Sequence, residues 1–466
     1  MGRPLRLDGG ERRAIAAGAL DALERLADVR ASGDVHRPAD RSLLELARTT
    51  PPQEPADPAD ILDRYVRFAA AGWDKSADGV FAYIPNGALD AGPIAALLAA
   101  GAHTFTGTSF EAPAMVAMEE GVLHWMADML GLPPTAGGLL LSGGSLANQT
   151  AIVTARARAS ASDRELADDV LTMYVSEHVH HSVTKAASLV GLSSRAVRTV
   201  ATDDSGRIEA EALRQVVEAD VTAGRRPFLV VGVAGTTDTG SIDPLEDLAD
   251  VAERAGAWFH VDAAYGGFFA LTERGRRRLR GIERADSVTV DAHKGLFLPY
   301  GVGAILVRDT EDLVAAHEGT GAYFRAIPTI EELPHYCQRG PELTRPTRGP
   351  LIWFPLQLHG TAAFAAELDR MLDLAARAHR RLTAMPGIVV GPAPELSIVA
   401  FRAAAGDEAT DDIVTALHAT GRFQVSTTTL DGRATIRFAF LSPRTTEARV
   451  AEALDLVAEI AVRAHR

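Results

Sequence analysis

Several chemically distinctive residues and segments are scarce or absent in this sequence. It has 466 residues but only one cysteine, Cys337, which excludes an internal disulfide and a cysteine-rich metal site. It has no run of about 18 apolar residues, so no membrane-spanning helix is expected. The first residues lack the apolar core of a secretory signal. These absences predict a cytoplasmic protein that is not inserted in a membrane.

Lysine and arginine residues together are fewer than acidic residues in this chain, and lysine is the rarer of the two. The formal net charge is −14 at pH 7, which disfavours nucleic acid and anionic membranes as partners because both attract cations. Only three of the 47 lysines and arginines are lysine: Lys75, Lys185 and Lys294. Arginine can replace lysine where only charge is needed, but only lysine readily becomes a nucleophilic amine. Each lysine is therefore a candidate nucleophile, and the residues around each one must indicate which of the three has that role.

The N-terminal region, residues 1–75, predicts helices at 11–30 and 61–71 that are separated by a proline-rich stretch. Such a short and interrupted region cannot bury a hydrophobic core of its own. We expect it to pack on another body, the partner subunit of a dimer.

The rest of the chain predicts two further units. In residues 76–345, short apolar strands alternate with helices, which predicts an α/β fold with a mostly parallel sheet covered on both faces. Ligands in such folds lie beyond the carboxyl ends of the strands. Residues 346–466 predict a smaller α+β unit. The expected strands are 138–141, 170–175, 228–233, 258–261, 287–290 and 303–307 in the larger unit, and 388–390, 396–402 and 435–440 in the smaller one. The expected helices include 146–159, 209–222, 243–255, an interruptible long helix at 354–385, and 446–464.

The first polar motif at a strand end is Ser142-Gly143-Gly144-Ser145, directly before a predicted helix. Backbone N–H groups at the start of a helix bind phosphate well, because they lie at its positive end. A simple turn with a serine cap explains the motif equally well. No Gly-Lys-Ser/Thr follows, so the motif is not a Walker loop.

A second motif contains three histidines, His178, His180 and His181, just after a predicted strand. Their spacing does not match the His-Glu-x-x-His pattern of zinc helices, and no cysteine lies nearby, so no metal site is expected. A flat imidazole that stacks on an aromatic cofactor fits the motif better. Exposed loop histidines are the alternative interpretation.

Two further strand ends carry Asp262 and Lys294. An acidic side chain at the end of an apolar strand is costly unless it is paired. A protonated pyridine nitrogen is one such partner; a structural salt bridge or a helix cap is another. Lys294 follows one strand-helix-strand step later, in Asp291-Ala292-His293-Lys294, whereas the other two lysines suit surface positions. A phosphate turn, a stacking ring, an aspartate and a lysine together predict a site for pyridoxal 5′-phosphate (PLP).

These motifs resemble, in order, those of the group II PLP-dependent amino acid decarboxylases, which include aromatic amino acid, glutamate and cysteine sulfinate decarboxylases. The resemblance extends from Phe81 to Arg437. It implies PLP-dependent fold type I, the aspartate aminotransferase-like fold, and a homodimer with sites at the interface. The matching motifs are Ser142-Gly143-Gly144-Ser145, His180-His181-Ser182, Gly235-Thr236-Thr237, His260-Val261-Asp262-Ala263-Ala264-Tyr265 and His293-Lys294.

The resemblance also implies roles for individual residues. Lys294 would hold PLP as a Schiff base, Asp262 would pair with the ring nitrogen, and His180 would stack on the ring. Tyr323 would protonate the α-carbon after CO₂ has left. The remaining residues of the implied cofactor site are Gly144, Ser145, Thr237, Ala264, Asp291 and His293, and those of the implied substrate site are Tyr83, Pro85 and Arg437.

The sequence departs from the family pattern mainly on the substrate side. Leu146 replaces a common Glu, and Ser109 replaces a frequent Trp, which weakens the expectation of an aromatic substrate. Tyr323 favours decarboxylation of an L-amino acid to an amine, because aldehyde-forming relatives usually have Phe at that position. The alternatives are an aldehyde synthase or aminotransferase that also uses PLP, and a non-catalytic homologue.

Overall fold

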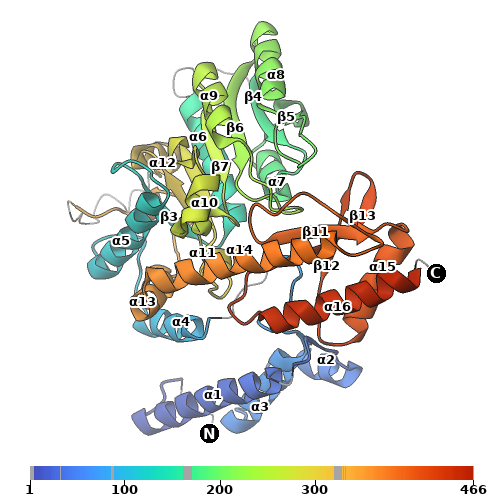
Figure 1. The fold of residues 1–466 in the computed structure, drawn as a ribbon. Helices are drawn as coiled ribbons and strands as arrows, with labels where there is room; N and C mark the ends of the chain where they lie inside the picture. The colour runs from blue at the N-terminus through green and yellow to red at the C-terminus, as the bar shows by residue number, and fades with distance from the viewer. Residues whose placement is uncertain are drawn as a thin grey trace.

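The computed structural model describes residues 5–31, 33–84, 89–160, 170–319, 328, 330 and 332–464. Two large β-sheets organise this part of the chain, as Figure 1 shows. The first has seven strands and the second has four. The first sheet positions the candidate site.

The seven-stranded sheet is mostly parallel, as predicted. Its strand order is β3-β9-β8-β7-β6-β4-β5, and among these strands β9 alone runs antiparallel to its neighbours. Every residue of β3, β4, β7, β8 and β9 is buried, so both faces of the sheet are covered, which explains their apolar sequences. The strands are β3 (Gly137–Leu141), β4 (Leu171–Ser176), β5 (Val197–Val200), β6 (Arg226–Val233), β7 (Trp258–Asp262), β8 (Ser287–Val290) and β9 (Gly303–Val307).

Helices between these strands pack on the sheet. The helix α6 contacts β6, β7, β8 and β9, while α8 and α9 contact β6. No described helix combines the length and the low polarity needed to cross a membrane. The helices of this part are α4 (Ala91–Ala102), α5 (Pro113–Met129), α6 (Gly144–Ser160), α7 (His181–Leu189), α8 (Ala210–Thr222), α9 (Leu245–Ala255), α10 (Glu273–Arg278), α11 (Ala292–Gly295) and α12 (Thr310–His317).

The four-stranded sheet is antiparallel, with the order β10-β11-β13-β12. The sequence analysis missed β12, whose residues alternate between covered and exposed and include three consecutive threonines. The long helix expected at 354–385 is interrupted at Gly360, which has a φ of +73°. The elements are α13 (Gly349–His359), α14 (Thr361–Thr383), β10 (Ile388–Val390), β11 (Ile398–Ala403), α15 (Asp407–Ala419), β12 (Ser426–Leu430), β13 (Arg433–Ala439) and α16 (Glu447–Ala464).

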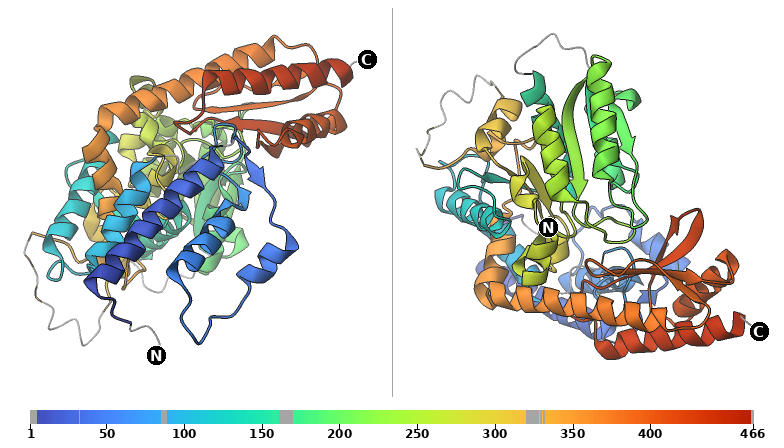
Figure 2. Two further views of the ribbon diagram at one scale, coloured as in Figure 1. Left: turned by 90° about the horizontal axis from the view of Figure 1, so that it is seen from below. Right: turned by 45° about the horizontal axis from the view of Figure 1, so that its top comes forward.

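The N-terminal helices pack on one another at the edge of the molecule. Figure 1 and Figure 2 show α1 (Gly9–Arg30) and α3 (Pro58–Ala70) side by side, away from the seven-stranded sheet. In the order of the chain, α2 (Arg41–Ala47) comes between these two helices. The short strand β1 (His36–Arg37) pairs with β2 (Gly72–Trp73). All residues of α3 are at least partly exposed. The unit boundaries at 75 and 345 stay a prediction.

Candidate active site

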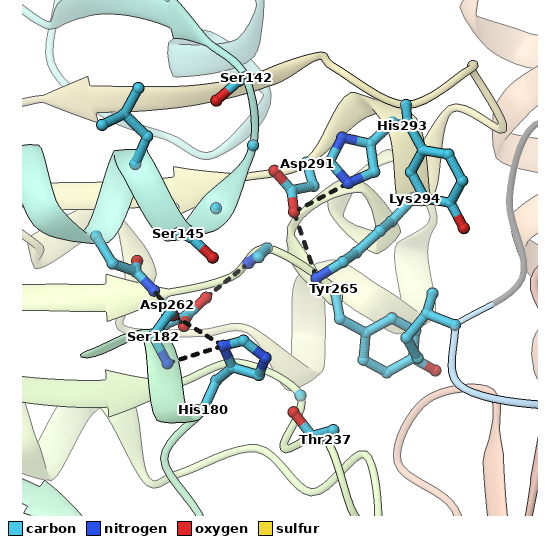
Figure 3. Close-up of a pocket in the computed structure, with 18 of the residues that line it drawn as sticks. Ser142, Ser145, His180, Ser182, Thr237, Asp262, Tyr265, Asp291, His293 and Lys294 are labelled. Atoms are coloured by element: carbon cyan, nitrogen blue, oxygen red, sulfur yellow. Dashed lines mark hydrogen bonds and ion pairs between the residues drawn. The ribbon is translucent and has the colours of Figure 1, made fainter. Parts of the chain in front are cut away.

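The carboxyl ends of β3, β4, β6, β7 and β8 meet around a cavity of about 470 Å³ (Figure 3). This is the expected place for a ligand in a parallel sheet. Five strand ends that are far apart in the sequence thus contribute to one cavity. All nine residues that were assigned to the cofactor line it: Gly144, Ser145, His180, Thr237, Asp262, Ala264, Asp291, His293 and Lys294.

The Gly143-Gly144 turn between β3 and α6 leaves room for a ligand group. Gly143 has a φ of +153°, and a Cβ atom on Gly144 would lie 3.1 Å from both Cβ of Ala264 and Oδ2 of Asp291. The first N–H groups of α6 have no acceptor within the helix and carry its partial positive charge. The turn therefore suits a phosphate group.

Lys294 is the only one of the three lysines that lines the cavity. Its Nζ lies 3.3 Å from Oδ2 of Asp291, and its side chain is 25% exposed. The same oxygen lies 3.4 Å from Nε2 of His293, whose Nδ1 donates to the carbonyl oxygen of Val302 at 2.9 Å. Burial lowers the pKa of His293. Asp291 is thus the carboxylate that pairs with the amine of Lys294.

The three-histidine motif separates into different environments. His180 caps α7 and lines the cavity, with Nδ1 lying 2.8 Å from Oγ of Ser182, and burial lowers its pKa. The ring of His181 lies 4.3 Å from that of His180. His178 instead lies 3.6 Å from a carboxylate oxygen of Asp238. Among the described residues, no cluster of three His, Cys, Asp or Glu side chains is arranged to hold a metal ion.

Asp262 is buried at the end of β7, and both of its carboxylate oxygens accept hydrogen bonds. Oδ1 accepts from the N–H of Ala264 at 3.1 Å, and Oδ2 accepts from Nδ2 of Asn148 at 2.8 Å. The sequence analysis did not identify Asn148 as a site residue. One signal was available, because the chain has only two asparagines and Asn148 lies about one helical turn after Gly144 on α6.

The residues predicted to bind substrate are not gathered in the same way. Arg437 is buried but does not line the cavity: Nε donates to the carbonyl oxygen of Asp238 at 2.9 Å, and Nη1 donates to Oγ of Ser426 at 3.0 Å. Tyr83 is 63% exposed and also lies outside the lining. Pro85 and Tyr323 lie outside the described residues.

Ser109, which replaces the frequent Trp, is fully buried and does not line the cavity. Its backbone N–H donates to Nδ1 of His335 at 3.1 Å. The larger apolar and aromatic residues that line the cavity, among those that the structure describes, include Ile84, Leu146, Tyr265 and Tyr300. Ser109 therefore forms no part of the cavity wall in this chain.

Known proteins identify the family. A model of the pyridoxal-dependent decarboxylase conserved domain matches residues 41–404. The chain belongs to this family. An aromatic-L-amino-acid decarboxylase from Bacillus atrophaeus is 34% identical over 375 residues, which cover 78% of this chain and 77% of that protein. An L-2,4-diaminobutyrate decarboxylase from Rhizobium meliloti is also 34% identical, over 75% of this chain and 71% of the relative.

Solved structures show the same fold over almost the whole chain. A crystal structure of Oryza sativa TDC with PLP and tryptamine superposes with a TM-score of 0.92 at 26% identity, and 99% of each chain is covered. The fold is therefore PLP-dependent fold type I, and this decarboxylase family member is a carboxy-lyase whose cofactor is PLP.

The cavity fits this cofactor. The glycine turn at the start of α6 matches a phosphate, the buried carboxylate of Asp262 matches a protonated pyridine nitrogen, and Lys294 supplies an amine within the same cavity. His180 supplies a flat ring beside them.

Proposed function

We propose that this PLP-dependent decarboxylase converts an L-amino acid to the corresponding amine and CO₂. The observation that carries the proposal is the convergence of Lys294, Asp262, His180 and the glycine turn on one cavity. Bound PLP accepts the electron pair that remains when the carboxylate leaves as CO₂.

Lys294 is proposed to bind PLP covalently through Nζ. Asp291, whose Oδ2 lies 3.3 Å from that atom, would orient the amine within the cavity. The same oxygen lies 3.4 Å from Nε2 of His293, so Asp291 would pair with His293 as well.

Asp262 and His180 are proposed to hold the ring. The carboxylate of Asp262 keeps a proton on the ring nitrogen by charge, which makes the ring a better electron acceptor. His180 covers one face of the ring, and because burial lowers its pKa the imidazole is held in its neutral form. Gly144 and Ser145 are proposed to bind the phosphate, with His293 beside them, and Thr237 and Ala264 to line the ring.

The proton that replaces CO₂ is proposed to come from Tyr323, a role that the family resemblance implies. Arg437 is proposed to act on the substrate carboxylate, and Tyr83 and Pro85 to line the substrate side.

Production of amine distinguishes this proposal from the aldehyde-forming alternative. That alternative is represented among the relatives by a phenylacetaldehyde synthase from Arabidopsis thaliana that is 28% identical over 81% of both proteins.

The chain is proposed to act as a cytoplasmic homodimer. Apolar side chains on the N-terminal helices are exposed, with Leu20 at 52%, Ile61 at 50% and Tyr65 at 53% of their full areas, and Leu97 on α4 at 62%. A second copy of the chain would cover these side chains and gain hydrophobic free energy. Light scattering tests this proposal: the mass of the protein in solution should be twice the 49.4 kDa mass of one chain.

The test of the function is a pair of measurements with purified protein and added PLP. Borohydride treatment should attach the cofactor irreversibly to the peptide that contains Lys294, and the Lys294→Ala variant should lose both this attachment and all turnover. Lys185→Ala is the matched control, since Lys185 does not line the cavity. Screening amino acids for CO₂ release should give amine in equal amount. Ammonia and peroxide in place of amine would support the aldehyde synthase, and a Lys294→Ala enzyme with full activity would refute the assignment.

A further inference from the structure

Asn148 occupies the centre of a buried hydrogen-bond network that connects two parts of the cofactor cavity. We propose that Asn148 is a positioning residue that fixes both the carboxylate of Asp262 and the tautomer of His180. The proposal rests on the proposed function for its catalytic consequence, but its geometry exists in the protein without cofactor. It follows from the direction in which each hydrogen bond in the network must run.

The network begins behind the cavity, at Trp258. Its indole Nε1–H can only donate, and it donates to Oγ of Ser287 at 2.7 Å. The hydroxyl proton of Ser287 is then free to point to Nδ1 of His260, which lies 2.8 Å away. The direction is fixed by Asp262: a carboxylate only accepts, so the NH₂ group of Asn148 faces Asp262 and its Oδ1 faces Nε2 of His260. The proton of the neutral His260 ring is therefore on Nε2, and Nδ1 accepts from Ser287.

His260 is in turn hydrogen-bonded to Asn148. The ring is fully buried, and burial lowers its pKa to about 4, so it is neutral near pH 7. Its Nε2–H donates to Oδ1 of Asn148 at 3.2 Å. The bond agrees with the amide orientation that the carboxylate of Asp262 requires, in which the NH₂ group points toward the cavity.

The NH₂ group of Asn148 has two protons and two acceptors. One proton goes to Oδ2 of Asp262 at 2.8 Å, and the other goes to Oγ of Ser182 at 3.0 Å. With Oγ of Ser182 accepting from Asn148, its hydroxyl proton is available for Nδ1 of His180, which lies 2.8 Å away. The backbone N–H of Ser182 points to the same nitrogen at 3.3 Å.

The consequence for His180 is a single tautomer. Two donors from Ser182 converge on Nδ1, so the neutral ring carries its proton on Nε2. The same amide that orients Ser182 also holds Asp262. Asn148 thus contacts the ring-nitrogen partner directly and the stacking imidazole through Ser182. Figure 3 shows Asp262, Ser182 and His180 next to one another.

Asparagine can donate to both Asp262 and Ser182 while it accepts from His260, which neither aspartate nor alanine can do. Aspartate at 148 would place a second carboxylate beside Asp262 and would accept from Ser182 instead of donating to it. Alanine would leave several buried polar atoms unpaired, since Asn148 is only 1% exposed. The chain has only two asparagines in 466 residues, so asparagine is seldom used here where another residue suffices.

The test compares Asn148→Asp with wild type by two readouts. The first is the ¹⁵N chemical shift of the His180 imidazole in cofactor-free protein, assigned by difference with His180→Phe. Wild type should show a protonated Nε2. Asn148→Asp should raise the share of rings protonated on Nδ1, because the Ser182 hydroxyl would then donate to the new carboxylate and only the backbone N–H of Ser182, at 3.3 Å, would remain on Nδ1. The second readout is PLP affinity, which should fall about tenfold or more.

Two further variants separate positioning from a general effect on folding. Thr150→Val removes a hydrogen bond from an equally buried residue of the same helix and should leave both readouts unchanged. Ser182→Ala removes the hydroxyl that connects Asn148 to His180 but leaves the backbone N–H of residue 182 on Nδ1 and the contact between Asn148 and Asp262. It should therefore raise the share of rings protonated on Nδ1 only in part, with a smaller loss of PLP affinity. It also tests the network if Asn148→Asp does not fold.

A wild-type tautomer in both Asn148→Asp and Ser182→Ala would overturn the proposal, as would a PLP affinity within about twofold of wild type in Asn148→Asp. Failure of the proposed function has a different signature. In that case the wild type would not attach PLP to Lys294, while the imidazole measurement, which needs no cofactor, would still report on Asn148.

Discussion

The cofactor cavity and the junction between the two large sheets are built in different ways. The cofactor cavity belongs to one sheet: its side chains come from residues next to the carboxyl ends of parallel strands and from α6. The junction between the two large sheets, where the turn after β6 meets β12 and β13, lies outside the cavity lining. At the cofactor cavity, neighbouring strands fix the distances between side chains, whereas at the junction the packing of one sheet on the other fixes them.

Asp238 is the central residue of the junction. Its Oδ1 accepts from Oγ1 of Thr428 at 2.6 Å, and its carbonyl oxygen accepts from Nε of Arg437 at 2.9 Å. His178, at 3.6 Å, completes the group. The pairing of the two side chains lowers the pKa of Asp238 and raises that of His178. We infer that changes at the cofactor cavity affect chemistry, and that changes at the junction affect mainly substrate binding and stability.

The largest expected effect comes from the cofactor cavity. Asp262→Ala should lower kcat by roughly 10²–10³, the range for loss of one group that stabilises developing charge. Asp238→Asn, a carboxylate change at the junction, is the matched control and should lower kcat much less. Steady-state kinetics at saturating PLP would measure both, and equal losses in kcat would remove the distinction between the cofactor cavity and the junction.

A smaller effect is expected at Arg437. Arg437→Met should lower the free energy of unfolding by about 1–3 kcal/mol, because buried oxygens of Asp238 and Ser426 lose a charged donor. If Arg437 also acts on the substrate carboxylate, KM should rise more than kcat falls. Denaturant unfolding and substrate titration measure the two effects separately, and Arg433→Met, at an exposed position on the same strand, is the control. Unchanged stability together with unchanged KM would remove any role of Arg437 at this junction.

The smallest expected effect is a pH dependence at His178. Its folded pKa is raised above its unfolded value, so its contribution to stability is fully present below the unfolded pKa of about 6.5 and is lost as pH rises through the higher folded pKa. The loss should be below about 1 kcal/mol, since the pair is partly exposed. The difference in unfolding free energy between wild type and His178→Gln, measured from pH 6 to pH 9, should shrink with rising pH. A constant difference would contradict this coupling.

Much of the fold followed from local sequence patterns. The runs that end at Leu141 and Asp262 are apolar because buried strands must be apolar on both faces, so they were recognisable one by one. The exposed alternation of β12 was missed, because such a strand is defined by its pairing with β13 and not by its own hydrophobicity. The interruption at Gly360 could be anticipated only in general terms, since a glycine can also continue a helix.

The sequence by itself determined which residues stand at the strand ends, and from them the fold class and the family. Lys294 was recognisable because its motif follows an apolar strand and because lysine is rare in this chain. Only the tertiary structure decided which residues meet. Asn148 and Asp262 are 114 positions apart, and their contact depends on how α6 crosses the sheet. The same reason separates Arg437 from the cavity lining: local sequence sets the element, but the packing of elements sets the distances.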